Sequence, residues 1–279
     1  MITSFDTSYK QLLLDLKYGG DYVISRGAGV KSLFGYTFGP MESHLVTIRK
    51  TSWKTALREL EWFMSGKDKC PEGVLRDLWW KGQLSNDHKL NRGYPTQLRR
   101  SSNSDGMFDQ VVWLRNEIKT NPTSRRLCLT VWNPCDMAFI PDYNDSNPMV
   151  PSSCHLVWNQ FQVRNNKLYM NAVFRSTDAI LGLPHNAIQH RALQLYFAHH
   201  AGVEAASYYQ LFLNDVHYYD HPTHNVFVDW LDDQSFEDFE ISDNELTYKP
   251  TSVEFKAEDF SFTKPIPDPM YTKKIERTL

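Results

Sequence analysis

The chain has 279 residues, a formal net charge of −3 and 41% hydrophobic residues, which fits a single domain over residues 1–279 with one large core. The near-neutral charge argues against non-specific binding to nucleic acid, so any anion-binding site must be local. The four cysteines form no CxxC pair, no run is apolar enough to span a membrane, and the first residues lack a signal-peptide pattern, so we expect a cytoplasmic protein with reduced thiols.

The N-terminal part of the sequence predicts a helix, a loop and a strand. Apolar residues at helical spacing over residues 9–16 predict the helix, which Gly19 and the glycine after it end. Residues 25–32 are rich in small residues and include Arg26. Such a loop lets backbone N–H groups approach a phosphate, but its composition also fits a surface turn. A strand is expected over residues 33–38.

A second helix is expected over residues 53–64, where apolar residues again follow helical spacing. It carries Glu59 and Glu61, and spacing alone places both acids toward solvent. Trp79 and Trp80 follow the helix. A tryptophan pair belongs to a core or an interface more often than to a cofactor site.

The middle of the chain is a polar stretch followed by a helix and a strand. Residues 85–106 are rich in turn-forming residues and predict a loop. A helix is expected over residues 111–118 and a strand over residues 127–132. Arg125 and Arg126 precede that strand, and such a pair is either solvated or binds a phosphate in bidentate fashion.

The second half of the chain predicts a hairpin, a helix and a long strand. Residues 155–163 and 167–174 alternate like two strands joined by a short Asn-containing turn. A helix is expected over residues 188–199, with Gly202 as its C-cap. An aromatic strand is expected over residues 207–219.

The residues with the clearest chemistry lie close together in sequence. Cys154 is a nucleophile, Arg175 and Ser176 form a pair that can bind an anion, Asp178 is an acid, and Asn186 carries an amide. The short apolar runs between them can fix their geometry. This stretch is therefore the candidate catalytic centre.

These residues resemble the family of thymidylate synthases and deoxypyrimidylate hydroxymethylases. The family pattern is Cys-His, then Arg-Ser-x-Asp, then Leu-Gly-x-Pro-x-Asn, and the chain has Cys154-His155, Arg175-Ser176-Thr177-Asp178 and Leu181-Gly182-Leu183-Pro184-His185-Asn186. The resemblance implies an α/β fold with a large mixed sheet flanked by helices, and a homodimer formed through the sheet face. It also implies one-carbon transfer from 5,10-methylenetetrahydrofolate to C5 of a deoxypyrimidine monophosphate, without a metal.

The chemistry of such a transfer explains why these residue types are needed. A pyrimidine C5 is a poor nucleophile, and addition of a thiolate to C6 makes it reactive. Arginine charge near the cysteine favours the thiolate. The resemblance implies catalytic roles for Cys154, Glu59, Tyr94, Asp178 and Asn186. It implies nucleotide binding by Arg26, Arg125, Arg126, His155, Gln160, Arg175, Ser176, Asn186, His217 and Tyr219.

The resemblance further implies that Trp79, Trp80 and Asp178 contact the folate. It implies that Arg125 and Arg126 are donated across the homodimer to the partner's phosphate site. Their function there would be to hold the nucleotide so that its ring is positioned for attack.

The base and the product are separate questions. Asn186 can pair with N3–H and O4 of uracil, whereas family members that act on dCMP typically have aspartate at this position, so dUMP is the expected substrate. The expected product is 5-hydroxymethyl-dUMP, because Glu61 replaces a usual leucine, the segment around it resembles phage hydroxymethylases, and the C-terminal residues 274–279 are polar. A phage-encoded enzyme would act in the host cytoplasm. The alternatives are dTMP and a reaction on dCMP.

Three other readings remain open from the sequence. Cys154, His217 and Asn186 imitate the residue set of a cysteine hydrolase. The spacing of His217, His221 and His224 imitates a metal site. The same scaffold can also serve as a nucleotide-binding or RNA-binding protein without catalysis.

Overall fold

The structure is a computed structural model that describes residues 3–25, 27–43, 47–103, 106–134, 155–239 and 244–277. Two residues of the expected site, Cys154 and Arg26, lie outside these ranges.

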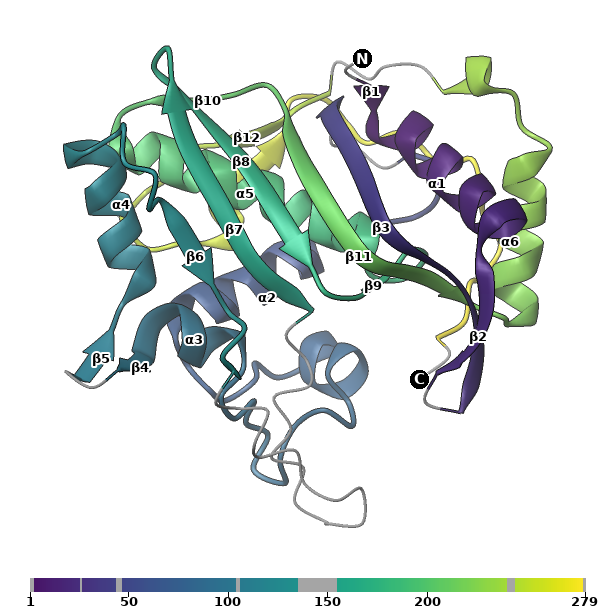
Figure 1. Ribbon diagram of the computed structural model, residues 1–279, viewed down its shortest axis with the longest axis horizontal. Coiled ribbons are helices and arrows are strands. Elements are labelled where there is room, and N and C mark those ends of the chain that lie inside the picture. The colour runs from purple at the N-terminus through teal and green to yellow at the C-terminus, as the bar shows by residue number, and fades with distance from the viewer. Residues whose placement is uncertain are drawn as a thin grey trace.

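A mixed β-sheet forms the centre of the molecule (Figure 1). Over the described residues it has nine strands, in the order β1-β3-β11-β8-β7-β6, with β2 beside β3, β10 beside β8 and β9 beside β11. Its long strands are β3 (Ala28–Ser43), β7 (Leu156–Arg164), β8 (Lys167–Phe174) and β11 (Tyr209–Tyr219). The shorter strands are β1 (Thr3–Ser4), β2 (Asp21–Ser25), β6 (Cys128–Thr130), β9 (Thr177–Asp178) and β10 (Glu204–Ala205).

The expected mixed sheet is confirmed by the strand directions. Strand β11 runs antiparallel to β3 and parallel to β8, and β8 runs antiparallel to β7. The predicted hairpin is β7 and β8, joined through Asn165 and Asn166. These two residues have φ of 50° and 58°, the left-handed conformation that a tight hairpin turn requires and that asparagine tolerates. Two further pairs of strands lie outside the sheet: β4 (Ser101–Asn103) with β5 (Gly106–Phe108), and β12 (Leu246–Tyr248) with β13 (Phe260–Phe262).

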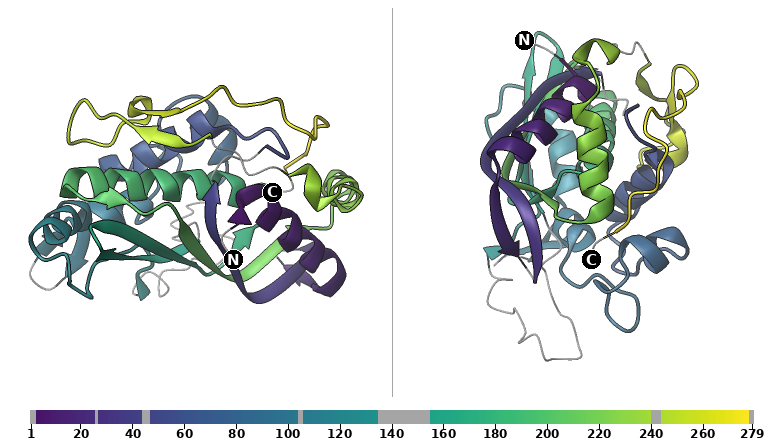
Figure 2. Two further views of the ribbon diagram at one scale, coloured as in Figure 1. Left: turned by 90° about the horizontal axis from the view of Figure 1, so that it is seen from above. Right: turned by 90° about the vertical axis from the view of Figure 1, so that its right-hand side faces the viewer.

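The main helices lie on one side of the sheet, as the edge-on views of Figure 2 show for α1, α5 and α6. They are α1 (Phe5–Gly19), α2 (Trp53–Ser65), α3 (Tyr94–Arg100), α4 (Gln110–Thr120), α5 (Leu183–Ala201) and α6 (Pro222–Asp232). Short helical turns cover η1 (Leu75–Trp79), η4 (Phe236–Asp238) and η5 (Ala257–Asp259). The predicted helices are confirmed as α1, α2, α4 and α5, and Gly202 caps α5 with φ of 76°.

The prediction of a loop over residues 85–106 was wrong for helix α3 and for strand β4, which follows it. Residues Tyr94–Arg100 form helix α3, with Pro95 in its first turn, where a missing N–H costs little. Packing of Leu98 into the core stabilises a helix too short to show a periodic pattern. The helix matters because it positions Tyr94.

A kink in the sheet determines which side chains of β11 face the helices. In the first half of β11 the buried residues include Leu211 and Leu213, and in the second half they are Val216 and Tyr218. The alternation changes phase opposite Gly35, whose φ of 80° is one that side chains rarely adopt. As a result, Asp215 and the odd-numbered residues after it point away from the helices.

Over the described residues, the opposite face of the sheet is left uncovered. Phe34 on β3 is 88% exposed and Trp158 on β7 is 42% exposed. Phe34 pairs with Asp215, and Trp158 pairs with Val173. Large exposed apolar side chains on one sheet face are typical of an interaction surface. Separately, no helix in the described part of the chain is long and apolar enough to cross a membrane.

Candidate active site

Several of the expected site residues lie on elements that meet where β8 ends and β7 begins, next to β9 and the first turn of α5 (Figure 1). The backbone N–H of Arg175, just after β8, donates to the carbonyl oxygen of His155 at 2.8 Å. Asp178 on β9 pairs with His217 on β11. Three separate segments of the sequence thus converge at one end of the sheet.

The start of β7 is held by Tyr94. Its hydroxyl oxygen accepts hydrogen bonds from the backbone N–H groups of His155 at 2.7 Å and Leu156 at 3.3 Å. The Tyr94 ring stacks on Phe63 with centroids 4.6 Å apart, so helix α2 fixes the direction of the hydroxyl. These bonds fix the backbone at the first two described residues of this segment.

Glu59 is the most unusual side chain of the cluster. It is only 8% exposed, and its two carboxylate oxygens accept hydrogen bonds from Trp80 Nε1 at 2.5 Å and from Gln189 Nε2 at 2.7 Å. Burial raises the pKa of Glu59 to about 7, although the bonds from Gln189 and Trp80 and the charge of Arg277 lower it. A carboxyl group with a pKa near neutrality can accept and return a proton.

Gln189 connects Glu59 to Asn186. Its amide nitrogen also donates to the carbonyl oxygen of Ala56 at 2.9 Å, so both N–H groups are used. Its amide oxygen accepts a hydrogen bond from Asn186 Nδ2 at 3.2 Å. The sequence analysis did not identify Gln189, although its position three residues after Asn186 on one helix was a usable signal.

Asp178 shapes the turn that leads into α5. Its Oδ1 accepts hydrogen bonds from the backbone N–H groups of Ile180 and Leu181, both at 2.8 Å. A Cβ atom on Gly182 would lie 3.1 Å from the carbonyl oxygen of Asp178 and 3.5 Å from Asn186 Oδ1. Asp178 and Asn186 therefore flank this glycine closely.

Arg175 and Ser176 lie beside a second acid that the sequence analysis missed. The Arg175 guanidinium lies 5.1 Å from the centre of the Trp132 ring. The hydroxyl groups of Ser176 and Ser32 donate to the two carboxylate oxygens of Asp215 at 3.2 and 2.6 Å. Asp215 lies two residues before His217 on a predicted strand, so the sequence already indicated that the two side chains share one face of the sheet.

Asp215 also interacts with His217, whose Nδ1 lies 3.4 Å from Oδ2. Burial alone would raise the pKa of Asp215, but the hydrogen bonds from His217, Ser32 and Ser176 outweigh it and lower the pKa below its usual value. Tyr219 continues the same face, with its ring centroid 5.5 Å from that of His217. Asp215 thus orients a serine and a histidine that were both expected to bind nucleotide.

Three expected nucleotide-binding residues lie apart from this cluster. Arg125 and Arg126 are exposed in the turn before β6, at the edge of the sheet. Gln160 donates to the carbonyl oxygen of Leu127 at 3.2 Å. It lies five residues along β7 from His155, roughly 16 Å at the rise of a strand. Within one chain, these residues do not share the site around Glu59.

The two tryptophans have different environments. Trp80 is 6% exposed and bound to Glu59, so its ring is part of the core and does not suit a folate platform. Trp79 is half-buried, with its ring centroid 4.7 Å from that of His185. Burial and the charge of Arg49 lower the pKa of His185 to about 3, so this ring is neutral. The half-buried Trp79 is the tryptophan that a ligand can reach.

Glu61 does not belong to the site. It is half-buried, and its Oε2 accepts a hydrogen bond at 3.1 Å from the backbone N–H of Ala257, at the start of η5. Residues two apart on a helix point about 200° apart, so Glu59 and Glu61 face different surroundings. The expectation that both acids face solvent was wrong, and Glu61 no longer bears on the product.

The histidines of the alternative metal site serve other purposes. His217 lies on β11, His221 caps the N-terminus of α6, and His224 lies inside α6, which Pro222 begins. The His224 Nε2 atom lies 2.9 Å from the carbonyl oxygen of Glu276. Over the residues that the structure describes, no group of three or more His, Cys, Asp or Glu is arranged to hold a metal.

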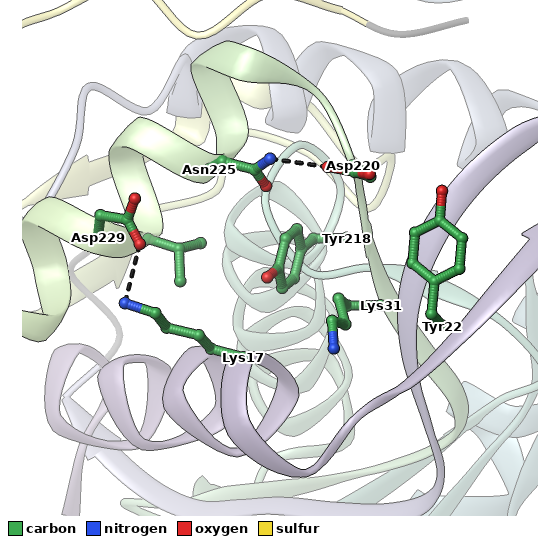
Figure 3. Close-up of a pocket in the computed structure, with 8 residues that line it drawn as sticks. Lys17, Tyr22, Lys31, Tyr218, Asp220, Asn225 and Asp229 are labelled. Carbon is green, nitrogen blue, oxygen red and sulfur yellow. Dashed lines mark hydrogen bonds and ion pairs between the residues drawn. The ribbon is translucent and has the colours of Figure 1, made fainter.

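A pocket of about 310 Å³ lies elsewhere, between α1, the β2–β3 hairpin and α6 (Figure 3). Tyr218 and Asp220 line it at the end of β11, and Lys17 crosses it to Asp229 at 2.8 Å. Tyr218 points to the helix side of β11, opposite to His217 and Tyr219. The pocket is therefore separate from the site.

Replacement of Glu59 by glutamine tests the burial of this acid. Its pKa rises from 4.5 in the unfolded chain to about 7 in the folded protein, so its ionisation makes folding less favourable as pH increases through that range. The penalty at pH 8 is on the order of 3 kcal/mol. Glu59→Gln should remove it, so the free energy of unfolding of the variant, relative to the native chain, should rise between pH 5 and pH 8.

Chemical denaturation at both pH values measures this difference. The exposed Glu254→Gln change is the control, since it relieves little burial. An equal pH dependence in the native chain and in Glu59→Gln would show that the carboxyl group is not buried as described.

Comparison with models of known protein families identifies the chain. A family model described as thymidylate synthase matches residues 7–273. The match includes Glu59, Asp178, Asn186 and Gln189, and it ends before Arg277. Since it spans nearly the whole chain, this protein belongs to the thymidylate synthase family, whose members transfer one-carbon units from methylenetetrahydrofolate to dUMP-like nucleotides.

Proposed function

We propose that the protein converts dUMP to 5-hydroxymethyl-dUMP with methylenetetrahydrofolate, through a bond between the Cys154 sulfur and C6 of the base. The observation that carries this proposal is the network from Glu59 through Gln189 to Asn186, next to the anchored start of β7. The network combines a proton-transfer group with a base-pairing amide. The family membership supports the reaction type.

In the proposed reaction, the thiolate of Cys154 adds to C6 and C5 attacks the one-carbon unit. Loss of the C5 proton and of tetrahydrofolate leaves a methylene group on C5. Water then bonds to the methylene carbon and passes its proton to Glu59. The electron pair of the C5–methylene double bond restores the C5–C6 double bond, and the thiolate leaves. A buried carboxyl group with a pKa near 7 suits the proton transfer at neutral pH.

The Gln189 contacts favour uracil over cytosine. Uracil needs Asn186 to accept from N3–H and to donate to O4, whereas cytosine needs the amide turned over. The turned amide would point its oxygen at the Gln189 oxygen, and Gln189 cannot turn because Ala56 and Glu59 both use its N–H groups. The orientation that suits uracil is therefore the one that Gln189 stabilises.

The nucleotide phosphate is assigned to Arg175 and Ser176, and the sugar hydroxyl to His217 and Tyr219. These residues lie on the uncovered side of the sheet, where Asp215 orients Ser176 and His217. His155 and Arg26 complete the proposed nucleotide site. Folate is assigned to the half-buried ring of Trp79, with Asp178 between folate and base.

We further propose a homodimer through the uncovered face of the sheet. The exposed Phe34 and Trp158 would be buried there. A twofold interface brings the same surface of both chains together. Arg125 and Arg126 would then reach the phosphate in the partner's site, which accounts for their distance from Glu59 within one chain.

An experiment must decide whether the product is 5-hydroxymethyl-dUMP or dTMP. The family description favours dTMP, which forms when folate supplies a hydride and becomes dihydrofolate. The polar C-terminal residues favour water. Mass spectrometry of the product from dUMP, with absorbance tracking dihydrofolate, should show 5-hydroxymethyl-dUMP without dihydrofolate. The rate with dCMP should be at least about tenfold lower. A methylated product with equal dihydrofolate would contradict the proposal.

Substitution of the nucleophile tests the covalent step. Cys154→Ser should lower turnover more than about 1000-fold, because a hydroxyl is a far weaker nucleophile than a thiolate. The dissociation constant for dUMP should change little. Cys128→Ser, at a half-buried thiol on β6, is the matched control and should retain activity. Comparable turnover in native protein and Cys154→Ser would exclude the covalent mechanism.

Mixing two inactive variants tests the shared site. Cys154→Ser lacks the nucleophile, and Arg125→Ala combined with Arg126→Ala lacks the donated arginines. After unfolding and refolding as an equal mixture, roughly a quarter of the native activity should return, because half of the dimers are mixed and each has one intact site. Activity no higher than that of the separate variants would mean that the arginines act within their own chain.

A further inference from the structure

The C-terminal segment is fixed to the body of the protein before it reaches Arg277. The backbone N–H of Tyr271 donates to the carbonyl oxygen of Ile48 at 2.7 Å, and that of Met270 donates to Thr47 at 3.1 Å. The Tyr271 ring is 4% exposed and packs on Phe227, with centroids 4.8 Å apart. This is the first attachment point.

The residue before Arg277 is held at both backbone atoms. The N–H of Glu276 donates to Thr223 Oγ1 at 3.1 Å, and its carbonyl oxygen accepts from His224 Nε2 at 2.9 Å. His224 is fully buried, so its ring cannot move without disturbing α6. The direction in which the chain enters Arg277 is therefore set by the first turn of α6.

Arg277 points back toward the site. Its Nη1 donates to the carbonyl oxygen of Leu78, the residue before Trp79. Partial burial lowers the pKa of its guanidinium and the charges of Glu59 and Asp178 oppose that shift, although the residue as a whole is exposed. Leu78 lies two residues before Trp80, whose indole donates to Glu59, so this bond ties the end of the described chain to the segment that contacts Glu59.

We propose that Arg277 is a specificity-determining residue, whose guanidinium, hydrogen-bonded to the carbonyl oxygen of Leu78, keeps water beside the C5 methylene group. This inference rests on the proposed function. It assigns the choice between water and hydride to one side chain outside the matched residues 7–273.

The physical reason is hydration. A guanidinium has five N–H donors, and Leu78 uses only some of them. The remaining donors retain water, because removing water from a charged group is costly. An apolar side chain in this position would instead exclude water from the methylene group and leave hydride as the available nucleophile.

The alternative is that Arg277 only fastens the chain end to Leu78. A fastening function predicts weaker folate binding on substitution and an unchanged product. A water-holding function predicts a changed product. The ratio of products therefore separates the two, whatever happens to the overall rate.

The test compares Arg277→Leu, Arg277→Lys and Lys273→Leu in the full-length protein. Lys273 is an exposed cation on the same segment and serves as the matched control. With dUMP and methylenetetrahydrofolate, Arg277→Leu should raise the ratio of dTMP to 5-hydroxymethyl-dUMP by about tenfold, the low end for one lost contact. Dihydrofolate should rise in proportion. Arg277→Lys should stay near the native ratio, and Lys273→Leu should match it.

Each outcome bears on a different claim. If the native protein makes 5-hydroxymethyl-dUMP and Arg277→Leu leaves the ratio unchanged, the function of Arg277 is refuted and the proposed function stands. If the native protein makes only dTMP, the proposed product is wrong. The proposed function of Arg277 in retaining water is then refuted as well. If Lys273→Leu changes the product ratio as much as Arg277→Leu, the ratio depends on the total positive charge of the C-terminal segment. That result also refutes the inference.

Discussion

The burial of the Glu59 carboxylate constrains the rest of the site. A buried carboxyl group must be hydrogen-bonded, and here the indole of Trp80 and the amide of Gln189 satisfy it. Those two bonds have consequences beyond Glu59. They commit Trp80 to the core and, together with the bond from Gln189 to the Ala56 carbonyl oxygen, leave Gln189 with only its oxygen to offer to Asn186. One acid in a helix thereby determines the direction of an amide on another helix.

The second half of the site, around Asp215 and His217, comes from the end of strand β11, where the side chains that point toward the helices change from odd-numbered to even-numbered residues. Because the kink opposite Gly35 turns the end of β11 over, Asp215 and His217 point away from the helices that bury Val216. The proposed phosphate and sugar contacts therefore lie on the uncovered side, whereas Glu59 lies on the helix side. A nucleotide spanning both would cross the end of the sheet, where β8 stops and β7 starts. Within one chain, the exposed Arg125 and Arg126 lie apart from both halves of this site.

Much of this arrangement was predictable from sequence, and the failures have physical causes. Periodicity predicted α2 and the β7–β8 hairpin, because long amphipathic patterns and asparagine turns are local signals. It could not predict α3, which is short and stabilised by its packing. It also could not distinguish Glu59 from Glu61, since their difference depends on what packs against each face of the helix. Gln189 and Asp215 belong to no motif in the sequence. Their importance comes from contacts with other site residues, which only the folded structure reveals.

The most direct test of the account is a crystal structure of Cys154→Ser with dUMP bound. The account predicts that C6 of the base lies against the residue 154 side chain and that the Asn186 amide pairs with N3 and O4. The phosphate should contact Arg175 and Ser176, with Arg125 or Arg126 of the partner subunit beside it. A base bound away from residue 154, or a phosphate held elsewhere on the protein, would contradict it.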